Sequence, residues 1–217
     1  YPKRNLEGHV SKLTTWNVKG INNVVKRGKI LSSLKKEGAH AAFLQETHLI
    51  FYSSFNSKSR GVAILLHKRL PFTVEKCIKD SEGRYVIISG FLYGEKLIQG
   101  CIYSPNTFEA SFYSKLIAVL SSNTSPLIIL GGDLNACLEP ELDQHPVKST
   151  HPSKTAIVTG ALFSDLNLFD TWRILNPKVF TFFSRPHNSF SRIDYFVTSR
   201  QALERVKTCS IKAMTLK

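Results

Sequence analysis

The segment from Leu127 to Asn135, Leu-Ile-Ile-Leu-Gly-Gly-Asp-Leu-Asn, constrains the fold of this chain more than any other. Its apolar run predicts a buried strand, and the two glycines allow the backbone to turn sharply where the strand ends. Asp133 and Asn135 then emerge two residues apart, so a carboxylate and an amide share one face at the open end of a sheet. The segment therefore predicts a polar site at the end of a buried strand.

Three other predicted strands also end in polar side chains. The residues that follow them directly are Asn17 after 13–16, Glu46 after 41–45 and Tyr103 after 98–102. Carboxylate and amide oxygens suit Mg²⁺, which keeps bound waters that a substrate phosphate can replace. The pattern as a whole predicts a divalent-metal site of the phosphodiesterase type.

Each of these side chains has a role in such a site. We expect Glu46 to bind the metal and Asn17 to share metal or phosphate binding. Asp133 would orient or deprotonate a water, and Asn135 would donate a hydrogen bond to the pentacovalent phosphorane. Tyr103, held by the turn that follows it, would donate to a phosphate oxygen. Taken singly, each residue also fits an ordinary role as a solvated strand end, a turn former or a core aromatic side chain.

Asp194 is an acid inside an apolar strand, in the sequence Ser-Arg-Ile-Asp-Tyr-Phe. A buried carboxylate requires a partner, and orienting a catalytic histidine is one such arrangement. A structural hydrogen bond or ion pair is the alternative.

The charge balance predicts a polyanionic partner. Among 217 residues, 29 are Lys or Arg and 16 are Asp or Glu, which gives a formal charge of +13 and a pI near 9.7. Such an excess steers phosphates toward a protein, although a basic surface without a ligand is the alternative. Basic residues recur beside the predicted site: Lys19, Lys26, Arg27, Lys58, Arg60, Arg185 and Arg192.

The four cysteines are scattered, without a Cys-x-x-Cys pair. A disulfide framework or zinc knuckle is therefore not expected, and a reducing cytosolic or nuclear setting fits. The sequence has no apolar run of about eighteen residues and no signal peptide. We expect one domain over 1–217, because no linker or repeat divides the chain, and excision from a longer protein, because the chain begins with Tyr.

Periodicity and turn residues predict an alternation of short strands and helices. The helices are expected at 25–36, 108–120, 153–166 and 201–206, and the strands at 13–18, 41–45, 61–67, 85–91, 96–103, 126–130, 180–184, 191–198 and 210–214. The pairs 85–91 with 96–103 and 180–184 with 191–198 are predicted hairpins. Many short strands with few helices predict an α+β fold in which two sheets pack together and helices flank them.

Seven stretches together resemble the endonuclease/exonuclease/phosphatase superfamily, the metal-dependent fold of apurinic endonucleases and pancreatic-type deoxyribonucleases. They are Thr-Trp-Asn-Val-Lys-Gly-Ile at 15–21, Phe-Leu-Gln-Glu-Thr-His at 43–48, Ser-Arg-Gly-Val-Ala at 59–63, Tyr-Ser-Pro-Asn at 103–106, Gly-Gly-Asp-Leu-Asn at 131–135, Thr-Phe-Phe-Ser at 181–184 and Ser-Arg-Ile-Asp-Tyr at 191–195. The resemblance is closest to the endonuclease domain of non-LTR retrotransposons of the long-interspersed-element type. It implies a deoxyribonuclease-like four-layer α/β sandwich with two mixed β-sheets.

This resemblance implies nicking of one strand of double-stranded DNA with Mg²⁺, for which Mn²⁺ could substitute. The nick would leave a 3′-hydroxyl that primes target-primed reverse transcription by the reverse-transcriptase domain of the same polyprotein. The protein would be a monomer that is synthesised in the cytoplasm, acts in the nucleus and does not engage a membrane. Glu46 and Asn17 would belong to the metal site, Asp133 would activate the water, and Asp194 would orient the general-base histidine.

The resemblance also implies a set of DNA-binding residues: Lys19, Arg60, Asn106, Thr181, Arg185, His187, Asn188, Ser191 and Arg192. The loop 185–191 would be a hairpin tip inserted into the minor groove, where it could read groove width and flexibility. An ordinary solvated hairpin tip is the alternative for this loop.

Two departures from the family pattern set limits on these expectations. The family ends in a Ser-Asp-His box that supplies a metal-site Asp and the catalytic His, and none of the seven histidines here has that context. We therefore expect this form to lack its last strand and its catalytic base. Only thirteen residues separate Glu46 from Arg60, so a missing loop is expected near Ile50-Phe51. An apurinic/apyrimidinic repair endonuclease and a non-catalytic DNA-binding module are the rival hypotheses.

Overall fold

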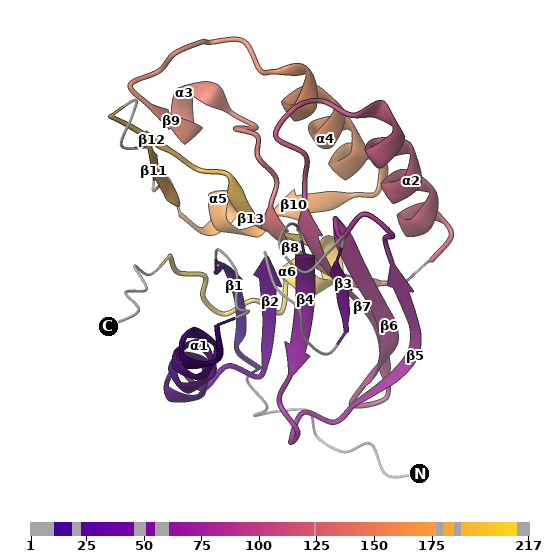
Figure 1. Ribbon diagram of the computed structural model, residues 1–217. Coiled ribbons are helices and arrows are strands. Elements are labelled where there is room, and N and C mark those ends of the chain that lie inside the picture. The colour runs from indigo at the N-terminus through magenta and orange to yellow at the C-terminus, as the bar shows by residue number, and fades with distance from the viewer. Residues whose placement is uncertain are drawn as a thin grey trace.

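A computed structural model describes residues 11–18, 23–45, 51–54, 61–123, 125–176, 180–184 and 188–211. Two β-sheets pack against each other, and helices cover their outer faces (Figure 1). The predicted two-sheet sandwich flanked by helices is therefore confirmed. Residues 46–50 and 212–214 lie outside the described residues. The predictions for Glu46, for a missing loop near Ile50-Phe51 and for most of the strand 210–214 are therefore not examined by the structure.

The first sheet has four strands in the order β1-β2-β4-β3. They are β1 (Leu13–Asn17), β2 (Ala41–Gln45), β4 (Gly61–Leu66) and β3 (Tyr52–Ser54). Strands β1 and β2 are parallel because α1 (Val24–Lys36) connects them across the outer face. Ile30 and Leu34 of this helix pack on Ala42 and Leu44 of β2. The parallel pair brings the carboxyl ends of β1 and β2 to the same edge.

The second sheet has six strands in the order β10-β13-β8-β7-β6-β5. They are β10 (Leu168–Asp170), β13 (Asp194–Ser199), β8 (Leu127–Asp133), β7 (Glu95–Tyr103), β6 (Tyr85–Leu92) and β5 (Phe72–Lys79). The predicted hairpin of β6 and β7 is confirmed, with Tyr93 and Gly94 at φ 52° and 87° in its turn. Strands β7 and β8 are parallel, so Tyr103 and Asp133 end side by side.

Two long helices cover the outer face of the six-stranded sheet. These are α2 (Ala110–Ser121) and α4 (Lys154–Asp165), which bury Phe112 and Leu162 against that sheet. Ser153 caps α4, as predicted, by accepting a hydrogen bond from the Ala156 backbone nitrogen at 3.2 Å. The shorter helices are α3 (Pro140–Asp143), α5 (Thr171–Leu175) and α6 (Arg200–Leu203).

The core between the two sheets is apolar. Phe43 and Ile64 of the first sheet meet Val86, Ile88 and Cys101 of the second, and all five are fully buried. None of the described helices is long and apolar enough to cross a membrane. All four cysteines are free thiols.

A third, small sheet was not predicted, and it corrects the second hairpin. It contains β11 (Phe182–Ser184), β12 (Ser189–Ser191) and β9 (Gln144–His145), in the order β11-β12-β9. The prediction joined 180–184 to 191–198, but the chain leaves this sheet after Ser191 and enters the six-stranded sheet at Asp194 as β13. The change of sheet occurs at Arg192, whose side chain is anchored in the interior.

Candidate active site

The predicted catalytic residues that the structure describes meet where four strands of the two large sheets come together. Strands β1, β7 and β8 end there and β13 begins there, in a cleft of about 640 Å³ that follows β1 from Leu13 to Asn17. Seven of the residues that line this cleft are sequence-predicted: Asn17, Tyr103, Asn106, Asp133, Asn135, Thr181 and Asp194. The structure therefore brings together residues that lie far apart in the sequence.

Asp133 is the central acid of this cluster, and only 4% of its surface is exposed. One carboxylate oxygen, Oδ2, accepts a hydrogen bond from Asn17 Nδ2 at 3.0 Å. The other, Oδ1, accepts from the Asn135 backbone nitrogen at 3.0 Å. Because Asn17 belongs to the first sheet and Asp133 to the second, the bond between them fixes the two sheets at the site.

Asn135 is held in place by the strand ends around it. Its backbone has φ 48°, a conformation that Asn tolerates better than most residues. Its Nδ2 donates to the Ser104 carbonyl oxygen at 2.8 Å, while the Ser104 nitrogen donates to the Asp133 carbonyl oxygen at 2.9 Å. An amide nitrogen carries two hydrogens, so the second can reach a ligand in the cleft.

Asp194 lies opposite Asp133 in the pairing of β13 with β8. The pKa of its carboxyl is raised from 3.8 to about 7. Burial is the largest cause, the negative charge of Asp133 also raises this pKa, and a hydrogen bond from Thr181 lowers it. The Thr181 Oγ1 also accepts from the backbone nitrogens of Ile193 at 3.1 Å and Asp194 at 3.2 Å. Thr181, expected at the DNA backbone, is thus engaged in holding the start of β13.

Tyr103 and Asn106 form another part of the cleft wall. Tyr103 is partly buried, pairs with Asp133 in register, and lies with its ring centroid 5.7 Å from the Arg84 guanidinium. Asn106 is exposed. Both side chains can donate hydrogen bonds to a phosphate.

Apart from Asn106 and Thr181, the predicted DNA-binding residues fall into three groups. Asn188 is exposed at the turn of the β11–β12 hairpin, with φ 42°, and Ser191 is partly buried at its base. Five site predictions lie outside the described residues: Lys19, Glu46, Arg60, Arg185 and His187. Arg192 forms the third group, because it has no exposed surface.

The prediction that Arg192 binds DNA is wrong. Its Nε donates to Asp143 at 2.8 Å, its Nη2 donates to Asp170 at 2.6 Å, and its guanidinium lies 4.2 Å from the Tyr195 ring centroid. Arg173 pairs with the same Asp143 carboxylate. A guanidinium enclosed by two carboxylates and a ring cannot reach a phosphate, so Arg192 serves the scaffold behind the site.

Aromatic side chains near the cleft were not among the sequence-based predictions. Phe182, Phe183 and Phe190 of the small sheet are 40%, 43% and 43% exposed, and the first two line the cleft. The Phe183 and Phe190 ring centroids are 4.7 Å apart. Two consecutive Phe residues in a strand point to opposite faces, so Phe-Phe in an exposed hairpin already signals a solvent-facing ring.

The donor set fits a hard divalent cation. The described acid and amide side chains that meet here present oxygen ligands, which Mg²⁺ prefers. No group of three or more His, Cys, Asp and Glu side chains lies together within the described ranges. The described residues alone do not form a metal site, and the predicted metal ligand Glu46 lies outside them.

Comparisons with known proteins agree with this architecture. Residues 14–212 match the endonuclease/exonuclease/phosphatase family. The chain is 26% identical over 222 residues to the transposon TX1 uncharacterized 149 kDa protein of Xenopus laevis, covering 92% of this chain but only 17% of that protein. It is 24% identical to an exodeoxyribonuclease of Bacillus subtilis, with 93% of each chain covered.

Solved structures show the same fold. The AP endonuclease LMAP of Leishmania major superposes with a TM-score of 0.70 at 20% identity, over 89% of this chain and 80% of that one. The endonuclease domain of TRAS1, a telomere-specific non-LTR retrotransposon, gives 0.65 at 14% identity, over 90% and 88%. The predicted deoxyribonuclease-like sandwich is thus confirmed.

Proposed function

The chain belongs to the endonuclease/exonuclease/phosphatase family, and from this premise we propose that it is a Mg²⁺-dependent endonuclease that nicks one DNA strand. The nick leaves a 3′-hydroxyl, which primes reverse transcription by the reverse-transcriptase domain of the same polyprotein in the nucleus. Similarity over 92% of the chain to the Xenopus transposon protein supports the retrotransposon setting. The similarity to TRAS1 supports it at the level of the fold.

One observation carries this proposal. Asn17, Asp133, Asn135 and Asp194 come from two sheets, yet Asp133 is bonded to Asn17 and Asn135 and lies opposite Asp194. Two carboxylates side by side are destabilising for a fold, and perturbed acids of this kind concentrate at functional sites. The cluster is therefore better explained by chemistry than by stability.

In the proposed mechanism, Asp133 orients the attacking water, because hydrogen bonds from Asn17 and Asn135 hold its carboxylate in one position. The second Nδ2 hydrogen of Asn135 and the Tyr103 hydroxyl donate to the phosphate oxygens as negative charge develops on them. Asp194 orients the general base, and Thr181 fixes Asp194 through its backbone and its carboxyl.

Asn17, through its amide oxygen, and Glu46 would hold the Mg²⁺. When bound, the ion would supply positive charge that neutralises the phosphate and stabilises the leaving oxygen. The Asn17 Nδ2 donates to Asp133, which turns the amide oxygen of Asn17 away from that carboxylate.

The general base in the proposal is the histidine of a Ser-Asp-His box on a further strand. Within the described residues, β1 is an edge strand that pairs only with β2. The cleft follows the other edge of β1 from Leu13 to Asn17 and reaches Asp133 and Asp194. A strand added along this edge would bring its side chains to the Asp194 carboxyl.

A second candidate is an apurinic-site endonuclease. The apolar side chains of Trp172, Phe182 and Ile193 line the cleft beside the acids. Such a wall can pack against the carbon atoms of a sugar that lacks its base. The similarity in fold to LMAP is compatible with this candidate.

Nicking of supercoiled plasmid tests the proposal. With Mg²⁺, protein that carries the Ser-Asp-His box should convert plasmid to the open-circular form, and a chelator should stop this conversion. Asp133→Asn should slow nicking at least about 100-fold, the lower range for loss of a positioned acid or base. Asp165→Asn, an exposed acid at the end of α4, is the control and should nick at the wild-type rate.

Two results would count against the proposal. Nicking that does not depend on a metal would contradict the proposed role of Mg²⁺. An unchanged nicking rate for Asp133→Asn, with its fold confirmed by circular dichroism, would contradict the proposed role of Asp133. Cleavage of plasmid that contains abasic sites, without cleavage of intact plasmid, would favour the apurinic-site candidate.

A further inference from the structure

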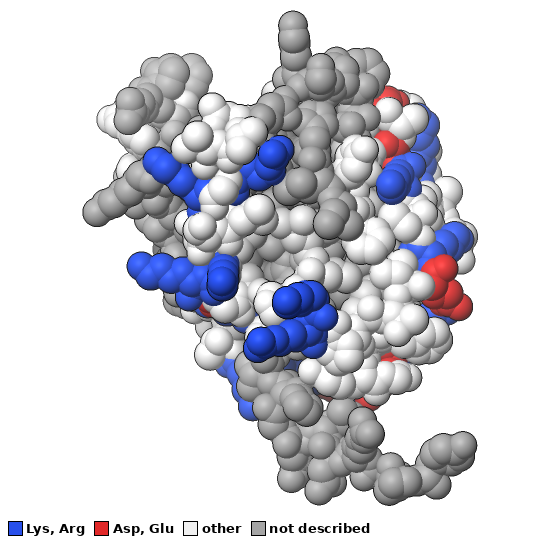
Figure 2. All heavy atoms as spheres, turned by 60° about the horizontal axis from the view of Figure 1, so that its bottom comes forward, with Lys and Arg blue, Asp and Glu red and all other residues white. Residues whose placement is uncertain are grey.

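A basic surface lies at the end of the four-stranded sheet away from the candidate active site. It is formed by the last turns of α1 and the β4–β5 turn, and we call it the distal basic surface. Its residues are Lys29, Lys35, Lys36, His40, His67, Lys68 and Arg69. Figure 2 shows several separate groups of blue Lys and Arg side chains on this side of the molecule, and most of the red side chains lie along one edge of the view.

Backbone hydrogen bonds hold the parts of this surface together. The His67 nitrogen donates to the His40 carbonyl oxygen at 2.8 Å, and the His40 nitrogen donates to the Lys12 carbonyl oxygen at 2.8 Å. The two imidazole centroids are 6.4 Å apart. The turn that carries Lys68 and Arg69 is therefore fixed beside the segment that follows the end of α1.

The two histidines present their donors in a defined way. His40 Nδ1 accepts from the Lys12 nitrogen at 3.0 Å, and His67 Nδ1 accepts from the Arg69 nitrogen at 3.2 Å. An accepting Nδ1 leaves the proton of the neutral ring on Nε2. Both rings can therefore donate from Nε2, as anion binding requires.

Internal pairing does not explain these charges. In the described part of the chain, Glu37 is the acid at this end of α1, and Lys12 bonds to it at 2.9 Å. Lys35 and Lys36 lie in the last turn of α1, where their positive charges interact favourably with the negative end of the helix dipole and stabilise the helix. Lys68 and Arg69 are exposed and have no ion pair with any described residue. Clustered like charges destabilise a fold, so a ligand is the better explanation.

The exposed cations of the surface lie outside the cleft. The far end of the cleft reaches Lys12 and Glu37, but Lys35, Lys36, Lys68 and Arg69 do not line it. Lys12 precedes β1 and Asn17 ends it, so five residues of strand, about 17 Å, lie between the two ends. A duplex that occupies the catalytic end would have to bend around the sheet to reach Lys68, and bending a duplex costs deformation energy. The two places therefore suit two separate segments.

We propose that the distal basic surface binds the phosphate backbone of a second segment of double-stranded DNA, while the cleft holds the segment to be nicked. The identity of the ligand in the cleft rests on the proposed function. A duplex fits better than a single strand, because single strands stack their bases on aromatic rings and the surface contains no Phe, Tyr or Trp. Bridging two segments would keep the enzyme on the chromosome between nicks.

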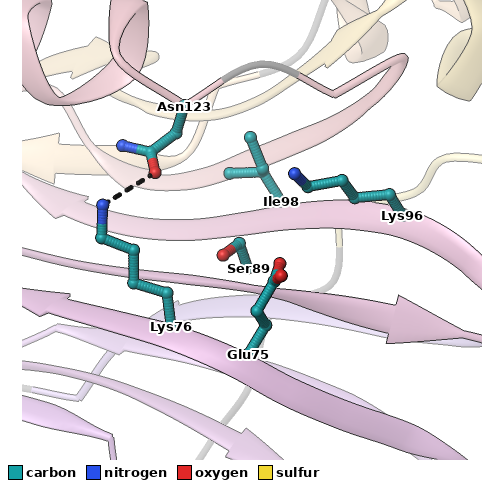
Figure 3. A pocket seen from close by; sticks show the side chains of 6 residues that line it. All are labelled: Glu75, Lys76, Ser89, Lys96, Ile98 and Asn123. Carbon is teal, nitrogen blue, oxygen red and sulfur yellow. Dashed lines mark hydrogen bonds between the residues drawn. The ribbon is translucent and has the colours of Figure 1, made fainter.

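The chain offers a matched control on another face. A shallow recess at the end of α2 contains Lys76 and Lys96, but Glu75 lies beside them and Lys76 Nζ donates to Asn123 at 3.2 Å (Figure 3). Both lysines are exposed. Replacing both lysines by glutamate changes the net charge as much as replacing Lys68 and Arg69 by glutamate. The change lies away from the distal basic surface.

The test counts duplexes per protein by analytical ultracentrifugation, with a fluorescent duplex of about 15 base pairs and chelator present, at low salt. The wild type and Lys76→Glu/Lys96→Glu should each bind two duplexes, and Lys68→Glu/Arg69→Glu should bind one. The double reversal should also lower the log–log salt slope of binding by about two. Its nicking rate on the short duplex should equal that of the wild type.

Two duplexes bound to Lys68→Glu/Arg69→Glu, or one bound to both the wild type and this variant, would overturn the inference. Binding of single-stranded RNA but not of duplex at this surface would also overturn it. If the wild type binds one duplex and Lys68→Glu/Arg69→Glu binds none, the distal basic surface binds DNA and the cleft does not. Failure of the proposed function is thus distinguishable from failure of this inference.

Discussion

At the scale of single residues, the molecule tolerates an unfavourable pair of acids. Asp194 faces Asp133 across two strands, and burial raises the pKa of Asp194 to about 7. The folded protein therefore holds a proton between about pH 4 and pH 7 that the unfolded chain releases. Because the folded state binds more protons in this range, stability falls as the pH rises through it.

Asp194→Asn should remove this pH-dependent loss. At pH 8 in chelator the variant should be more stable than the wild type by on the order of 2–4 kcal/mol, since one pKa unit corresponds to about 1.4 kcal/mol. At pH 4 the two should be nearly equal. Urea unfolding at the two pH values measures the difference. Nicking at pH 8 should fall, because the amide cannot hold a protonated base.

The control for this prediction is Asp165→Asn, which removes an exposed acid from the end of α4. It should change neither the pH dependence of stability nor the nicking rate. A variant Asp194→Asn that is less stable than the wild type at pH 8 would show that the Asp194 carboxylate is a net stabilising group.

At the scale of elements, strand β8 shows why two glycines precede the catalytic acid. The sequence predicted a sharp turn there, but β8 continues to Asp133 and both glycines lie within the strand. A Cβ at Gly132 would lie 1.9 Å from the Ile102 carbonyl oxygen, and its φ is 155°. A Cβ at Gly131 would lie 2.6 Å from the Phe43 ring. The glycines allow close approach to β7 and to the other sheet.

Gly132→Ala should destabilise the protein by about 2 kcal/mol or more, because a positive φ and a backbone clash combine. Its effect should appear as a lower urea midpoint with an unchanged slope. Gly160→Ala is the matched control: this glycine is exposed in α4, and its Cβ would meet nothing within 4 Å. It should stabilise the helix by about 0.5–1 kcal/mol. Equal effects of the two variants would exclude the packing argument.

At the scale of the whole molecule, positive charge is divided between a buried scaffold and an exposed surface. Arg192 joins Asp143 of α3 to Asp170 of β10 and so ties the small sheet to the six-stranded sheet. Tyr195 donates to the same Asp143 at 3.1 Å. The exposed lysines and arginines, by contrast, are those that can reach phosphates.

Arg192→Ala should cost about 3–5 kcal/mol of stability, because it leaves two carboxylates in the interior without their partner. At temperatures where the variant remains folded, its log–log salt slope of DNA binding should equal that of the wild type. Arg200→Ala removes an exposed guanidinium that lies 4.7 Å from the Phe169 ring centroid, and should cost little stability. A reduced slope for folded Arg192→Ala would show that the guanidinium reaches DNA.

Elements with a strong apolar pattern were predictable from the sequence. Strand β2 (Ala41–Gln45) has the predicted bounds, and α1 begins one residue before its predicted start. Strand β5 (Phe72–Lys79) was missed, because as an edge strand it alternates with exposed polar residues and contains a bulge between Val74 and Lys76. The local pattern of an edge strand is weak, since only pairing with β6 stabilises it.

The sequence by itself determined the set of polar residues at the strand ends, because buried strands must end in solvent-facing turns and each such turn follows directly from its apolar run. Only the tertiary structure decided which of them meet. Asn17 and Asp133 are bonded because the two sheets pack face to face. Arg192 is buried rather than exposed because Asp143 and Asp170 converge on it from separate elements. Contacts between distant segments depend on packing, which local periodicity does not encode.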